Sequence, residues 1–146
     1  MILVTGAAGF IGSNIVASLN KKGYKNIIIC DWVDHHSKKK NLEKLTYEKI
    51  ISPENIIQYL ENSKDIELII HMGANSSTTE TNFRLIYNMN TRFSKNLWKW
   101  CVNNKVRLIY ASSAATYGDG KNGFMDSEKT DEPQKDPQTK RRVYPS

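Results

Sequence analysis

A glycine-rich loop between an apolar run and an amphipathic segment constrains this chain more than any other feature. Residues 2–5 read Ile-Leu-Val-Thr, which is typical of a buried strand, and apolar residues at helical spacing follow over 10–22. Between them, Gly6 permits a tight turn, Gly9 lets the backbone approach a pyrophosphate, and Gly12 allows close packing of helix on strand. Such loops also occur as ordinary turns, but the position between strand and helix favours a dinucleotide site.

Strands and helices alternate along the sequence. The predicted elements are strands at 2–5, 27–31, 66–71 and 106–111, helices at 10–22, from Pro53 onward and over 81–104, and a lysine-rich loop at 32–49 with a short helix around 42–49. This order predicts the α/β class, with a Rossmann-type doubly wound parallel sheet of about four strands and helices on both faces. Ligands of such sheets bind beyond the carboxyl ends of the strands, where the polar loops of this chain lie.

The composition is that of an ordinary globular protein. Its 146 residues predict one domain, and no apolar run approaches the ~18 residues of a membrane span. No secretory signal precedes the first strand, so we expect a cytoplasmic protein with no membrane partner. The net charge is +6, but no nucleic-acid-reading motif accompanies the lysines, and we expect no nucleic-acid partner. Cys30 and Cys101 lie in apolar segments and are expected to be reduced core thiols.

An acid, Asp31, ends the second predicted strand. A carboxylate there can accept hydrogen bonds from the adenosine ribose, which favours NAD because a 2′-phosphate would be repelled. Lys38, Lys39 and Lys40 follow in the adjoining loop and could reach such a phosphate, although a solvated charge run explains them equally well. The local residues leave the choice between NAD and NADP open.

Small polar residues follow the last two predicted strands. Residues 73–80 read Gly-Ala-Asn-Ser-Ser-Thr-Thr-Glu, and residues 110–118 read Tyr-Ala-Ser-Ser-Ala-Ala-Thr-Tyr-Gly. A serine at the second of these places would point into the ligand crevice, where its hydroxyl could hold a substrate oxygen. The alternative is a turn of small residues. A hydrolase is not indicated, because the sequence holds no Gly-x-Ser-x-Gly motif.

Taken together, these motifs resemble the extended short-chain dehydrogenase/reductases, and among them the nucleotide-sugar epimerases. The strings at 71–80 and 110–118 narrow the resemblance to the ADP-glycero-manno-heptose 6-epimerases, bacterial enzymes of lipopolysaccharide inner-core synthesis. The resemblance covers residues 1 to about 125. It implies an ADP-heptose substrate, a cofactor that takes a hydride from C6 of the sugar and returns it to the other face, and homo-oligomers among full-length relatives.

The resemblance also implies roles for single residues. It implies NADP as the cofactor, with NAD possible, and Ser113 as the catalytic serine. The residues expected to bind the cofactor, those of the glycine loop included, are Gly6, Gly9, Phe10, Ile11, Gly12, Asp31, Trp32, Lys38, Met72, Gly73, Ala74, Asn75, Ser76, Met89 and Asn90. No metal ligands are expected.

The sequence departs from the family's pattern near its end. The proton relay of the family uses a Tyr-x-x-x-Lys motif, in which the lysine lowers the pKa of the phenol. Tyr144 is the only tyrosine after Tyr117, and no lysine follows it in this sequence. We therefore expect a dinucleotide-binding domain over 1–120, a polar and disordered tail over 121–146, no substrate domain, and little or no epimerase activity from a chain truncated in this way.

Two alternatives stay open. The chain could belong to another NAD(P)-dependent nucleotide-sugar epimerase or dehydratase, a choice that the substrate domain would decide. It could also be a non-catalytic dinucleotide-binding module, in which case it would bind the cofactor without turnover.

Overall fold

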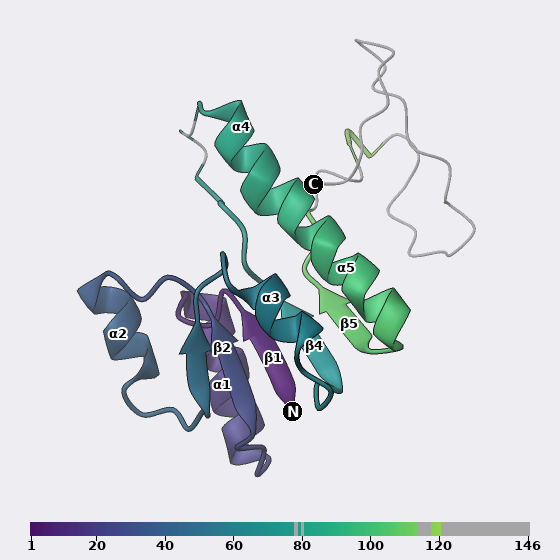
Figure 1. Ribbon diagram of the computed structural model, residues 1–146. Coiled ribbons are helices and arrows are strands. Elements are labelled where there is room, and N and C mark those ends of the chain that lie inside the picture. Colours follow the sequence, from purple (N-terminus) through teal and green to yellow (C-terminus); the bar gives the residue numbers. More distant parts are fainter. Residues whose placement is uncertain (78, 80, 114–117, 121–146) are drawn as a thin grey trace. The chain divides into compact units, whose positions relative to one another are not determined.

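The computed structural model describes residues 1–77, 79, 81–113 and 118–120. The chain divides into two units, Met1–Tyr110 and Ala111–Ser146. The first unit holds all the helices and strands of the described residues (Figure 1). The predicted tail over 121–146, with Tyr144, lies outside the described residues.

The first unit is built on a parallel sheet in the order β3-β2-β1-β4-β5. Its strands are β1 (Ile2–Thr5), β2 (Ile27–Cys30), β3 (Lys49–Ile51), β4 (Leu68–His71) and β5 (Arg107–Tyr110). Strand order 3-2-1-4-5 is the order of the first five strands of the classic doubly wound sheet. The predicted α/β class is confirmed. Because all five strands run the same way, the loops that follow them meet at one edge of the sheet.

Helices cover both faces of this sheet. They are α1 (Phe10–Lys21), α2 (His36–Leu42), α3 (Ile56–Glu61), α4 (Phe83–Ile86), the π-helical turn η1 (Tyr87–Arg92) and α5 (Phe93–Asn104). The last three form one continuous helical run (Figure 1). The predicted long helix over 81–104 is therefore confirmed, with a π turn that its periodicity did not predict.

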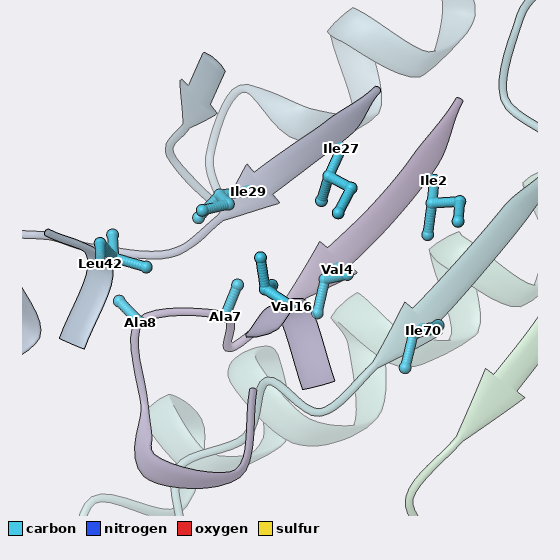
Figure 2. Close-up of a cluster of buried hydrophobic side chains, with 9 residues drawn as sticks. All are labelled: Ile2, Val4, Ala7, Ala8, Val16, Ile27, Ile29, Leu42 and Ile70. Carbon is cyan, nitrogen blue, oxygen red and sulfur yellow. The ribbon is translucent and has the colours of Figure 1, made fainter. Parts of the chain in front are cut away.

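The strands alternate their side chains between two apolar clusters, as the period of two requires. Ile2 and Val4 of β1 pack in one cluster with α1 and α2, and Figure 2 shows its nine buried side chains. Leu3 points to the other cluster, which α3 and α5 cover. Both cysteines belong to this second cluster and are buried free thiols, which confirms the prediction. The sheet is thus packed on both faces, and this packing fixes the positions from which the loops at its carboxyl edge start.

The region 32–55 differs from the prediction. Lys49–Ile51 forms a fifth strand where a loop or short helix was expected, so the count of about four strands is wrong. The segment escapes periodicity because it is only three residues long and lies at an exposed edge of the sheet. The expected helix around 42–49 lies earlier, at α2, where only Leu42 is buried. The helix expected from Pro53 starts at Ile56, after a turn.

Candidate cofactor-binding site

The glycine loop packs against the loop that follows β4. Gly6 has a φ of +64°, and a Cβ placed there would lie 2.8 Å from the backbone of Gly73. A Cβ at Gly12 would overlap the carbonyl oxygen of Gly6 and lie 2.7 Å from the Cα of Ala7. Backbone thus meets backbone at these positions, and only hydrogen fits in place of a side chain. The loop is held close to the sheet, with its open side at the start of α1.

The first turn of α1 offers amides to an anion. Gly9 is the N-cap and supplies no side-chain cap, and the first turn holds no acid. The first amides of a helix have no acceptor within the helix and lie at its positive end. The side chains of Phe10 and Ile11 are 82% and 65% exposed, so solvent reaches this end of the helix. These features fit the pyrophosphate of a dinucleotide.

Asp31 is buried at the end of β2 and joins three parts of the site. Its Oδ2 accepts a hydrogen bond of 2.9 Å from the Ala8 amide of the glycine loop. Its Oδ1 accepts one of 2.7 Å from the ammonium of Lys38, which α2 supplies. The carboxylate is therefore neutralised by a lysine on the side where an adenosine ribose would bind.

Trp32 continues this edge with a half-exposed indole. Its Nε1 donates a hydrogen bond of 2.6 Å to Oε1 of Glu54. A backbone hydrogen bond and, less strongly, this indole hold the pKa of the Glu54 carboxyl below its usual value. The indole is thereby fixed beside Asp31, where it offers a flat apolar face to a ligand.

The loop after β4 is tied to the long helix by an asparagine pair. The Asn75 amide donates to Oδ1 of Asn90 at 2.7 Å, and Nδ2 of Asn90 donates to the Asn75 carbonyl at 3.0 Å. The side chain of Asn90 thus replaces a strand partner for the loop backbone. Asn90 lies in η1, and π turns are frequent at functional sites.

Sequence reasoning missed His71, the last residue of β4. Its ring is 1% exposed and lies 2.5 Å from Thr5 Oγ1 through Nδ1 and 2.7 Å from Ser94 Oγ through Nε2. Burial lowers its pKa to about 4, so the imidazole is neutral at physiological pH. The rings of Phe93 and Tyr110 lie 5.5 and 5.3 Å away. The only sign of this residue's importance in the sequence was that a histidine ends an otherwise apolar strand.

The structure gathers most of the predicted cofactor residues at one edge of the sheet. The loop residues Gly6, Gly9 and Gly12, the helix residues Phe10 and Ile11, and Asp31, Trp32, Lys38, Gly73, Asn75 and Asn90 all lie there. Met72 packs against the first apolar cluster, Ala74 and Ser76 are exposed, and Met89 is half-buried in η1. Ser113 is exposed, three residues after β5, and belongs to the second unit.

These observations define a class, the Rossmann-type α/β domain with a glycine loop at its first helix. The chain belongs to the NAD-dependent epimerase/dehydratase family, whose sequence model matches residues 2–145. The match includes residues 126–145, where we expected a departure from the family. Within the described residues, no helix has the length and apolar character to cross a membrane.

Curated relatives narrow the comparison. The chain is 43% identical over 137 residues to an ADP-L-glycero-D-manno-heptose-6-epimerase of Brachyspira hyodysenteriae, covering 91% of this chain and 43% of the relative. It is 44% identical over 138 residues to the enzyme of the same name from Fusobacterium nucleatum, covering 92% and 42%. The resemblance found in the sequence is thus confirmed. The chain spans less than half the length of these relatives.

Solved structures agree with this placement. The Helicobacter pylori ADP-L-glycero-D-manno-heptose-6-epimerase superposes with a TM-score of 0.73 at 29% identity, covering 87% of this chain and 43% of that one. The UDP-glucuronic acid 4-epimerase of Bacillus cereus, solved with NAD, gives a TM-score of 0.66 at 27% identity and covers 81% and 41%. The family uses a nicotinamide dinucleotide, and its members named here are isomerases of nucleotide sugars.

Proposed function

We propose that this chain forms the cofactor-binding part of an ADP-glycero-manno-heptose 6-epimerase and that its cofactor is NADP. The observation that carries the proposal is that the first-turn amides of α1 and the Asp31–Lys38 pair lie at the same edge of the sheet. Identity of 43% and 44% to two enzymes of that name supports the substrate class. The proposal takes residues 1–120 as the dinucleotide-binding domain of a cytoplasmic enzyme.

Each part of the site has a separate task in this proposal. The amides of Phe10 and Ile11 bind the pyrophosphate, and Asp31 with Trp32 binds the adenosine. The loop at 72–76 flanks the nicotinamide half, together with Met89 and Asn90.

The choice of NADP rests on Lys38. Its ammonium lies 2.7 Å from the Asp31 carboxylate and is itself about a third exposed, so it can contact a ligand as well. A charge-assisted hydrogen bond to a 2′-phosphate is worth about 1.5–3 kcal/mol. Because the lysine also neutralises Asp31, the repulsion that otherwise favours NAD is reduced.

The reaction follows from the family's chemistry. When bound, the dinucleotide would supply hydride transfer: a hydride would be removed from C6 of the heptose and returned to the opposite face, with no net oxidation. The hydroxyl of Ser113 would hold the sugar oxygen during this exchange. The buried loop contacts keep the cofactor edge in one geometry, which limits the loss of entropy on binding.

Titration with NADPH and NADH tests the cofactor proposal. We expect both to bind the purified chain and NADPH to bind at least several-fold more tightly, measured by calorimetry or nicotinamide fluorescence. Equal affinities would overturn the NADP assignment. Failure of both to bind would overturn the cofactor site itself.

A second candidate function is the epimerisation of another nucleotide sugar. The structural likeness to a UDP-glucuronic acid 4-epimerase favours it. The two are distinguished by titrating the purified protein, with its cofactor bound, with ADP-heptose and with UDP-glucuronic acid and measuring the affinity for each by calorimetry. Binding of the UDP-sugar alone would replace our assignment of the substrate.

A further inference from the structure

A series of hydrogen bonds runs through the interior from the loop after β4 to the long helix. The Gly73 amide donates to Thr5 Oγ1 at 3.0 Å, and Thr5 Oγ1 lies 2.5 Å from His71 Nδ1. On the other side of the ring, Nε2 lies 2.7 Å from Ser94 Oγ, which donates to the Asn90 carbonyl at 2.5 Å. This series of hydrogen bonds therefore links β1, β4, the loop after β4 and η1 through the buried side chain of His71.

The donors along this chain fix the tautomer of His71. A hydroxyl carries one hydrogen, and that of Ser94 is used on the Asn90 carbonyl. Ser94 must therefore accept from Nε2–H, which leaves Nδ1 of the neutral ring as an acceptor for the Thr5 hydroxyl. Thr5 Oγ1 in turn accepts from the Gly73 amide. Every hydrogen in the chain has one acceptor, so the arrangement holds only for the neutral Nε2–H form.

We propose that His71, as the neutral Nε2–H tautomer, is the positioning residue that sets the loop at 72–76 and Asn90 against the glycine loop. This inference rests on the proposed function, because that loop is the one assigned to the nicotinamide half of the cofactor. Neither nitrogen of His71 is open to a ligand, since Thr5 and Ser94 occupy both. The histidine therefore acts on the cofactor through the backbone that it holds.

The route from His71 to the loop has two branches. Through Thr5, it fixes the Gly73 amide at the point where Gly6 has no room for a side chain and where a Cβ on Gly73 would lie 3.0 Å from Thr5 Oγ1. Through Ser94, it fixes the carbonyl of Asn90, whose side chain holds the Asn75 amide and carbonyl. Loss of the Ser94 hydroxyl breaks the second branch alone and leaves the core packing in place.

A pair of serine variants isolates this branch. Ser94→Ala removes a hydroxyl that links His71 to the helix, whereas Ser63→Ala removes one with the same local bond, to the carbonyl of Tyr59 four residues back at 2.8 Å. Ser63 is far from the carboxyl edge, just after the end of α3. Each variant loses one hydrogen bond from a serine hydroxyl to a carbonyl four residues back, so a loss of stability from that local bond appears in both. Ser94→Ala alone also loses the bond from His71 Nε2.

Two ligands then separate positioning from stability. We expect Ser94→Ala to weaken NADPH binding about five-fold, the equivalent of one hydrogen bond. Adenosine 2′,5′-bisphosphate, which lacks the nicotinamide half, is expected to bind Ser94→Ala and wild type alike. Ser63→Ala should bind both ligands as the wild type does. Equal NADPH affinity in Ser94→Ala and wild type, or an equal loss for both ligands, would overturn the inference.

Variants of His71 test the tautomer directly. His71→Gln keeps an amide donor that can reach Ser94, and His71→Phe keeps only ring volume. We expect the NADPH affinity of His71→Gln to lie between that of the wild type and the lower affinity of His71→Phe. A ¹⁵N-labelled wild-type sample should show a protonated Nε2 and an unprotonated Nδ1 at pH 7 with no ligand added. A protonated Nδ1 would overturn the inference whether or not the protein binds a dinucleotide. Failure to bind any dinucleotide would instead refute the proposed function.

Discussion

At the residue scale, the site combines side chains that the sequence could and could not assign. Asp31 and Lys38 lie seven positions apart in the sequence. Because lysines follow the acid at the strand end so closely, the sequence itself indicated that the two side chains lie near each other. His71 and Thr5 are 66 positions apart, and their contact arises only when β1 and β4 pair. Local patterns carry no information on such a pair.

Lys38 provides the first prediction at this scale. Lys38→Met removes the ammonium and leaves the Asp31 carboxylate unpaired beside the ribose position. We expect NADPH affinity to fall about ten-fold or more and NADH affinity to change far less. Lys40→Met, an exposed neighbour on the same helix, is the matched control. Equal losses for NADPH and NADH, or the same loss in the control, would contradict the role of Lys38.

The buried imidazole of His71 predicts a dependence of stability on pH. Its pKa is lowered from 6.5 to about 4 by burial, so the unfolded chain binds the proton more readily than the folded one. Its contribution is fully present above pH 6.5 and is lost as the pH falls toward 4. At pH 5 the loss is about 2 kcal/mol relative to pH 7.

Urea unfolding of wild type and His71→Gln at pH 7 and pH 5 measures this contribution. Carboxyl groups titrate equally in both proteins, so the difference between them isolates the imidazole. We expect the wild type to lose more of its free energy of unfolding than the variant does. Parallel losses in the two proteins would show that His71 does not titrate in this range.

At the element scale, segments with a strong apolar pattern were predictable and a weakly patterned one was not. β1 is a continuous apolar run, α1 and the run from Phe83 to Asn104 show helical apolar periods, and each was predicted within a few residues. β3 has three residues at a sheet edge, and its identity depends on pairing with β2. The π turn coincides with the contacts of Asn90 with the loop after β4, and periodicity does not encode such contacts.

The junction of glycine loop and α1 gives a prediction of its own. In Gly12→Ala the added methyl would overlap the backbone of Gly6 and Ala7, atoms that cannot rotate away. We expect a loss of about 2–4 kcal/mol in the free energy of unfolding. At Gly23 the φ is +88° with no atom within 4 Å of a Cβ, so Gly23→Ala carries backbone strain alone, about 1–2 kcal/mol. A Gly12→Ala loss no larger than that of Gly23→Ala, by urea unfolding, would contradict the close packing.

At the scale of the whole molecule, the sequence indicated the family from residues that lie mostly in the first unit. The glycine loop, Asp31 and the loop after β4 all belong to Met1–Tyr110, while Ser113 belongs to the second unit. The described cofactor residues thus become a site only when the first unit folds. In the proposed function, we therefore expect cofactor binding to be linked to the folding of that unit and to be separable from catalysis.

This linkage predicts that NADPH raises the melting temperature. A ligand at a hundred-fold excess over its dissociation constant adds ~2.7 kcal/mol to the free energy of unfolding, or on the order of 10 °C for a unit of this size. We expect this shift for wild type by circular dichroism, and a smaller NADPH shift for Lys38→Met, whose shift with NADH stays close to that of wild type. Because the shift reports binding to the folded state alone, it requires no substrate and no turnover. An unchanged melting temperature with both dinucleotides at millimolar concentration would mean that the carboxyl edge of this sheet does not hold the cofactor.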